Sequence, residues 1–240
     1  MRSASRYTTM PNFTASLHLV ALLSLSLAVV CAVTIALDEW HHPPKMAVMA
    51  VVWPLTALFG SVLWLAIYYR WGRSTRQDDN YPFAVSVLKG ASHCGAGCTL
   101  GDIVAEGIAV AMPMVAVWFG YGTLFTTRMF ALWVPDFLLA FLFGIGFQYW
   151  SIVPMRHLSL WAGLKAALKA DVLSISAWQV GMYGGMALIQ FAWFQRQFGG
   201  LATPTQAEFW FAMQLAMLAG FCTSYPMNWF LVRKGVKEAM

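Results

Sequence analysis

Six long apolar stretches constrain this chain more than any other feature of its sequence. Each is about as long as the 20 or so apolar residues that a helix needs to cross a bilayer. They are Leu17–Leu37, Met46–Tyr69, Ser92–Trp118, Met129–Val153, Val172–Phe194 and Phe209–Val232. Segments of about ten alternating residues, which a membrane β-barrel needs, are absent. The sequence therefore predicts an all-α, polytopic membrane bundle of six transmembrane helices.

The scarcity of charge agrees with a membrane location. Charged residues make up 10% of the 240 residues, whereas soluble domains carry about 25%. So few charges cannot cover a water-facing surface, which argues against a soluble enzyme, a disordered chain or a nucleic-acid-binding module. The expected partner is the lipid bilayer, and no nucleic-acid partner is needed to explain the net charge of +5.

The basic residues predict how the bundle is oriented. Following the chain, the fifteen Lys and Arg residues fall into the tails and loops as 2, 1, 4, 1, 3, 1 and 3. Because basic residues favour cytoplasmic loops, this alternation predicts N-in/C-in topology in a bacterial inner membrane, with both termini cytoplasmic. A cleaved signal peptide is the alternative for the first stretch, but its apolar run exceeds the usual 7–15 residues. We expect a two-helix segment, 1–90, and a four-helix segment, 91–240.

Four chemically active side chains recur at a helical spacing in the third stretch. Cys94, Cys98, Asp102 and Glu106 are four residues apart, and His93 precedes the first of them. Residues i and i+4 lie on one face of a helix. Charged residues inside a span are costly and are functional candidates by default. The spacing thus predicts a polar stripe that faces the bundle interior.

One interpretation of the stripe is a metal site. Thiolates and imidazole suit copper(I) or zinc, so His93, Cys94, Cys98 and Asp102 are candidate ligands. Their C-x3-C spacing differs from the C-x2-C knuckle of structural zinc sites. The alternative is that the cysteines are small apolar fillers and Asp102 caps or hydrogen-bonds a neighbouring helix.

A second interpretation concerns an ion or proton path. Helical rise places Glu106 and Asp136, of the third and fourth stretches, at similar depth, with Glu106 about 20 Å from the cytoplasmic end. Two facing carboxyl groups share a proton or hold a cation between them. The alternative is that Asp136, which follows Val134-Pro135, caps the start of a helix after a break.

Other polar residues are expected near the cytoplasmic end. Asp171 is expected to open the fifth helix, and Pro226 and Asn228 lie near the end of the sixth stretch. Together with Arg156 and His157 they predict either a polar vestibule or ordinary side chains at the membrane interface.

Three sequence blocks carry a resemblance to a known family. The run His93-Cys94-Gly95-Ala96-Gly97-Cys98-Thr99-Leu100-Gly101-Asp102 fits the pattern H-C-x-x-G-C-x-x-G-[DE], and further blocks start at Arg156 and Tyr225. Over about residues 91–238 the chain resembles a bacterial integral-membrane family known as domain of unknown function 4396. The resemblance implies marked positions of unknown role at His93, Cys94, Cys98, Asp102, Asp171, Pro226 and Asn228. That family has no established activity, so the resemblance implies a fold class and a motif but no reaction.

Three functions remain open from the sequence. The first is handling or transport of a soft transition-metal ion such as copper(I) by the stripe. The second is a proton- or cation-coupled carrier of small solutes built on Asp102, Glu106 and Asp136. The third is a non-catalytic accessory or assembly subunit that binds other membrane subunits. No P-loop, GxSxG or HExxH motif occurs, so the sequence points to no catalytic residues and favours a non-enzyme.

Overall fold

The computed structural model describes residues 11–73 and 82–237, and these residues form helices and their connections. Six helices are long and apolar enough to cross a membrane, as predicted. The elements are α1 Ala15–His41, α2 Met49–Ile67 continued by the π-helical turn η1 Tyr68–Gly72, α3 Phe83–Ala111, α4 Met114–Trp118, α5 Arg128–Arg156, α6 Leu160–Ala187 continued by η2 Leu188–Phe194 and α7 Gln195–Phe198, and α8 Ala207–Arg233. The predicted division into 1–90 and 91–240 stays a prediction.

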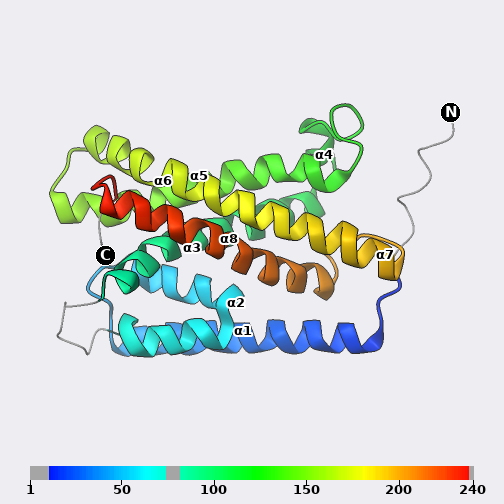
Figure 1. Ribbon diagram of the computed structural model, residues 1–240, viewed down its shortest axis with the longest axis horizontal. Helices are drawn as coiled ribbons and strands as arrows, with labels where there is room; N and C mark the ends of the chain where they lie inside the picture. The colour runs from blue at the N-terminus through cyan, green and yellow to red at the C-terminus, as the bar shows by residue number, and fades with distance from the viewer. Residues whose placement is uncertain (1–10, 74–81, 238–240) are drawn as a thin grey trace.

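The second apolar helix folds back on itself halfway along its length. Ser61 has a positive φ of 46° with ψ of −130°, which interrupts the helix. The Trp53 and Tyr68 ring centroids lie only 5.9 Å apart, whereas a straight helix would separate these residues by about 22 Å. Residues 49–72 therefore form a helical hairpin whose tip lies inside the bundle (Figure 1).

Contacts at both ends of the hairpin establish its direction. The Tyr68 hydroxyl donates to the Asp38 carboxylate at 2.7 Å, and the Arg73 guanidinium donates to it at 2.9 Å. Asp38 belongs to the last turn of α1, so the hairpin returns to the end at which α1 finishes. At the tip, the Gln214 side-chain amide of α8 donates to the Leu58 carbonyl at 2.8 Å, which satisfies a backbone group freed by the reversal.

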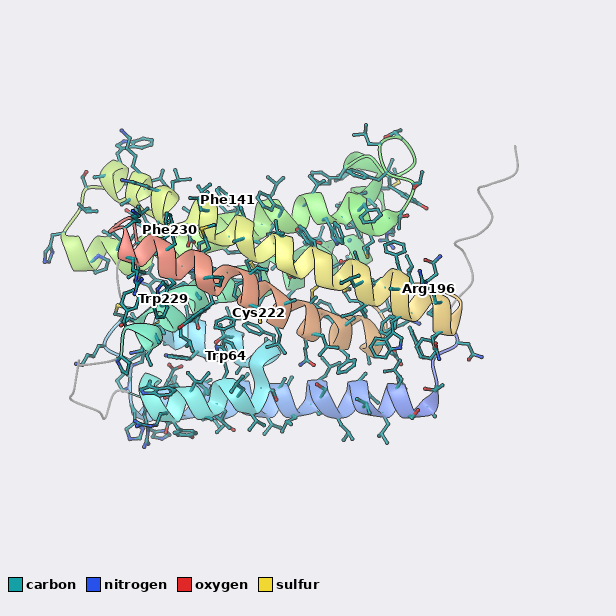
Figure 2. All side chains as sticks on the ribbon, in the orientation of Figure 1. Trp64, Phe141, Arg196, Cys222, Trp229 and Phe230 are labelled. Atoms are coloured by element: carbon teal, nitrogen blue, oxygen red, sulfur yellow. The ribbon has the colours of Figure 1, made fainter. Side chains whose placement is uncertain are left out.

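The hairpin changes the predicted topology. We call the end where α1, α5 and α8 finish and α3 and α6 begin the Lys237 end, and the opposite end the Arg128 end (Figure 1). In Figure 2, Trp229 lies towards the first and Arg196 lies at the second. The described chain starts at the Arg128 end, where the Asn12 N–H donates to the Phe198 carbonyl, and finishes at the Lys237 end. The described residues thus begin and finish at opposite ends of the bundle, whereas the predicted N-in/C-in topology assumed a straight second helix. The orientation of the termini in a membrane stays a prediction.

Helix α3 is the central element of the bundle. It packs against α2, α5, α6 and α8, and every residue from Gly90 to Thr99 is buried. Small residues permit this close packing: a Cβ atom at Gly97 would lie 2.7 Å from the Gly144 backbone, and one at Gly101 would lie 2.5 Å from the Ala140 nitrogen. The backbones of α3 and α5 therefore approach each other closely where the predicted stripe lies.

Two of the predicted helices have different boundaries in the structure. The third helix begins at Phe83, nine residues earlier than predicted, and ends at Ala111 just before Pro113, which starts the separate helix α4. The fifth begins at Leu160 instead of Val172. In both cases Lys residues in the first turns made helical sequence look like a loop, although long side chains reach polar surroundings from a helix.

Candidate functional site

A buried ion pair lies at the Lys237 end of the stripe. The Lys237 ammonium is 3.1 Å from the Asp171 carboxylate, and both side chains are fully buried. The ammonium also donates to the Gly90 carbonyl at 3.2 Å and to the Cys94 Sγ at 3.5 Å. The chain beyond α8 thus turns back at Gly235, where φ is +66°, and places a lysine between α3 and α6.

The Cys94 thiol is part of the same cluster. It donates to the Asp171 carboxylate at 3.3 Å and lies 2.7 Å from the Ser174 hydroxyl. We call Cys94, Asp171, Ser174 and Lys237 the lysine cluster. Asp171 is the twelfth residue of α6, so the prediction that it opens a helix was wrong, because the helix starts earlier.

Helix α8 supports the lysine cluster from behind. The Ser224 hydroxyl donates to the Ser174 carbonyl at 3.1 Å. The Asn228 amide donates to both oxygens of Ser224 at 2.9 Å. Asn228 is fully buried, whereas Pro226 lies on an exposed side of α8. Of the two residues predicted in this helix, Pro226 and Asn228, only Asn228 is thus connected to the lysine cluster, through Ser224.

Two opposing effects act on the protonation of Lys237. Burial alone would lower its pKa, since it disfavours the charged form. The Cys94 and Asp171 groups favour that form, and together they outweigh burial, so the pKa of Lys237 lies above its ordinary value. The lysine is therefore a permanent positive charge within the bundle at neutral pH.

Three carboxyl groups form a second cluster closer to the Arg128 end. Asp102, Glu106 and Asp136 are buried, and each has at least one oxygen without a hydrogen-bond partner. Asp136 interacts electrostatically with both Asp102 and Glu106. We call these three residues the carboxylate cluster. The predicted proximity of Glu106 and Asp136 agrees with this interaction, although their role in an ion path stays a prediction.

The surroundings of this cluster correct two expectations. Asp136 is the ninth residue of α5, which begins at Arg128, so it does not cap a helix start. Glu106 lies five residues before the end of α3, so it is nearer the Arg128 end than predicted. There, Arg128 interacts electrostatically with Glu106, while its guanidinium donates to the Ala109 carbonyl at 2.8 Å.

Two cavities reach the carboxylate cluster from different directions. A cavity of about 280 Å³ at the Arg128 end is lined by Glu106, Arg128 and Tyr121, among others. A second, of about 310 Å³, is lined by Asp102 and lies beyond the tip of the α2 hairpin. Asp102 and Glu106 are one helical turn apart, so the pair lies where the two cavities approach each other.

The structure divides the predicted metal ligands. Cys94 belongs to the lysine cluster, Cys98 packs in the apolar core, and Asp102 belongs to the carboxylate cluster. His93 is fully buried with neither ring nitrogen hydrogen-bonded. Among residues 11–73 and 82–237, no group of three or more His, Cys, Asp and Glu side chains is arranged to hold a metal ion. Copper(I) or zinc binding by His93, Cys94, Cys98 and Asp102 stays a prediction.

Sequence reasoning missed two residues that the structure brings to these clusters. The sequence places Lys237 among the basic residues of the C-terminal tail, and nothing in its sequence surroundings distinguishes it from Lys234. Tyr183 of α6 interacts electrostatically with Asp102, Glu106 and Asp136, and its hydroxyl donates to the Trp133 carbonyl at 2.9 Å. No sequence motif marked that tyrosine.

Comparison with known proteins identifies a family. Residues 85–237 match the family described as a domain of unknown function, DUF4396. The chain belongs to this family. The matched region begins in the first turn of α3 and ends at Lys237, so the DUF4396 region contains both clusters, whereas α1 and the α2 hairpin precede it. No curated protein and no solved structure matches the chain.

Proposed function

We propose that this chain is a membrane carrier that moves a proton, or a cation exchanged for a proton, along the buried face of α3. The observation that supports this most is the carboxylate cluster. A buried carboxylate without a hydrogen-bond partner must be neutralised, either by a proton or by a bound cation. Three of them together, reached by two cavities, are suited to exchange one for the other.

The packing supports a pathway that is open at one end. The cavity at the Arg128 end leads to Glu106. Towards the Lys237 end, Cys98 and Cys94 follow at one-turn intervals and are fully buried. Beyond them the Lys237–Asp171 pair closes the bundle. In this proposal the lysine cluster is the closed gate of a carrier captured with its other end accessible.

The distribution of basic residues supports an orientation for the carrier. Near the Lys237 end lie Lys45, Arg70, Arg73, Lys89, Arg156, Lys165, Lys169, Arg233, Lys234 and Lys237. Near the Arg128 end, the basic residues of the described part of the chain are Arg128 and Arg196. By the positive-inside rule, we propose that the Lys237 end faces the cytoplasm of a bacterium, with the start of α1 on the other side.

Ion flux in liposomes tests the proposal. The purified chain is reconstituted with a pH-sensitive dye inside, and a potassium diffusion potential drives proton entry in the presence or absence of sodium. We expect wild-type flux above that of empty liposomes, and flux at the empty-liposome level for Glu106→Gln and Asp136→Asn. Glu39→Gln is the matched control. Glu39 is also a buried carboxyl group without a hydrogen-bond partner, but it lies near the end of α1, at the Lys237 end of the bundle. Wild-type flux equal to that of empty liposomes would refute the proposal.

A further inference from the structure

The cavity beyond the hairpin tip follows from the hairpin itself. Residues 49–72 fill the space between α1 and α3 only from the Lys237 end to Ser61 (Figure 1). Past the tip, that space is left open and forms the cavity of about 310 Å³. Its walls come from α1, the tip residues Leu58 and Phe59, α3, and the first half of α8.

The polar groups of this cavity, with one exception, have partners within the protein. The Thr99 hydroxyl donates to the Gly95 carbonyl at 2.8 Å. The Gln214 amide donates to Leu58 and accepts from the Ser24 hydroxyl. Asp102 is the exception, since it is 1% exposed and neither of its oxygens has a hydrogen-bond partner. The cavity thus offers a single anionic acceptor inside apolar walls.

The remaining walls suit the apolar part of a cation. Phe59 and Trp210 contribute aromatic rings, and Met213 and Met217 contribute polarisable thioethers. Aromatic faces attract organic cations through their quadrupole. A bare inorganic cation would require several oxygen ligands, and this cavity has one free carboxyl group.

The mouth of the cavity faces the surface that contacts lipid. Val29 of α1 and Ile103 of α3 line the cavity, and these two residues are 52% and 40% exposed. These residues lie in membrane-spanning helices, so the mouth opens sideways between α1 and α3. A ligand with apolar substituents would enter from the bilayer.

From this geometry we propose that the cavity is a binding site for a monovalent organic cation with apolar substituents, an amine or quaternary ammonium whose charge pairs with Asp102. This proposal rests on the proposed carrier function and names its substrate class. The same carboxyl group that exchanges protons would hold the cation, so binding of the cation and of a proton would compete.

Equilibrium dialysis of radiolabelled benzyltrimethylammonium against the full chain in lipid nanodiscs tests the proposal. We expect saturable binding that weakens at least about tenfold in Asp102→Asn, because a charge-assisted contact is lost. Ala28→Phe, which fills the cavity from α1, should weaken it too and serves if Asp102→Asn does not fold. Glu39→Gln should bind like wild type.

Two results would overturn the proposal. One is binding that neither Asp102→Asn nor Ala28→Phe changes. The other is displacement by benzyl alcohol as effective as by unlabelled benzyltrimethylammonium, which would mean an apolar cavity for lipid or neutral molecules. The carrier proposal is tested separately by flux without this ligand: binding without flux refutes the carrier alone, and flux without binding refutes the organic-cation site alone.

Discussion

The Lys237 ammonium lies 3.1 Å from the Asp171 carboxylate, and water reaches neither side chain. The pair joins the segment after α8 to the middle of α6 and brings Cys94 of α3 into the same cluster. Three elements distant in sequence are thus held together by one lysine at the end of the matched family region.

Removing one partner of this pair should destabilise the chain strongly. Lys237→Met leaves the Asp171 charge buried without its cation, at a cost of about 3–5 kcal/mol. The double variant Lys237→Met with Asp171→Asn should recover much of that loss, because no unpaired charge remains. Thermal unfolding in detergent measures both, with the exposed Lys234→Met as control. A Lys237→Met midpoint equal to that of Lys234→Met would contradict the expected role.

The same pair predicts how stability depends on alkaline pH. Because the pKa of Lys237 is raised in the folded chain, its stabilising contribution is fully present below the unfolded lysine pKa of about 10.4. It is lost as pH rises through the higher folded value. The contribution of Lys237 to the unfolding midpoint should therefore stay constant from pH 7 to about 10 and decrease above that pH. The fall should be absent in the double variant; an equal fall there would assign it to other groups.

The hairpin predicts which residues can be labelled from the same side of a membrane. Trp40 is 85% exposed and Arg70 is also exposed, and both lie at the Lys237 end. Cysteines introduced at Trp40 and Arg70 should react with an impermeant maleimide from one side, and a cysteine at the exposed Thr123 from the other. The chain without introduced cysteines is the control, since it measures the labelling of the native cysteines. Labelling of positions 40 and 70 from opposite sides would mean that the second helix crosses straight through.

Close packing of α3 on α5 predicts a contrast between two glycines. Gly101→Ala places a methyl group against the Ala140 backbone, and such overpacking costs about 1–3 kcal/mol. It should also reduce ion flux, since it pushes Asp102 and Glu106 away from Asp136. At Gly107 a Cβ meets no atom within 4 Å, so Gly107→Ala should be neutral or slightly stabilising. Unfolding midpoints and flux, measured on both, decide whether this packing matters.

Much of the fold was predictable because bilayer thickness constrains sequence directly. Helix number, apolarity and the shared face of Asp102 and Glu106 depend on length and spacing, which are local. The reversal at Ser61 was not predictable, because Gly60 and Ser61 lie within a stretch that contains no charged residue and has the length of one straight helix. The position of Lys237 was not either, since burial of a lysine depends on partners from α3 and α6 that only the folded bundle assembles.

The reversal at Ser61 also has a consequence for biosynthesis. Irregular backbone at membrane depth is tolerated only where protein covers it. Here part of that cover comes from Gln214 of α8, whose amide binds the Leu58 carbonyl. Residues 49–72 are made long before α8, so the tip of the hairpin cannot reach its final hydrogen bonding until the last helix has been synthesised. The second element of the chain is therefore completed by the last one, and a nascent chain that stops before α8 would leave the hairpin tip as a recognisable defect for membrane quality control.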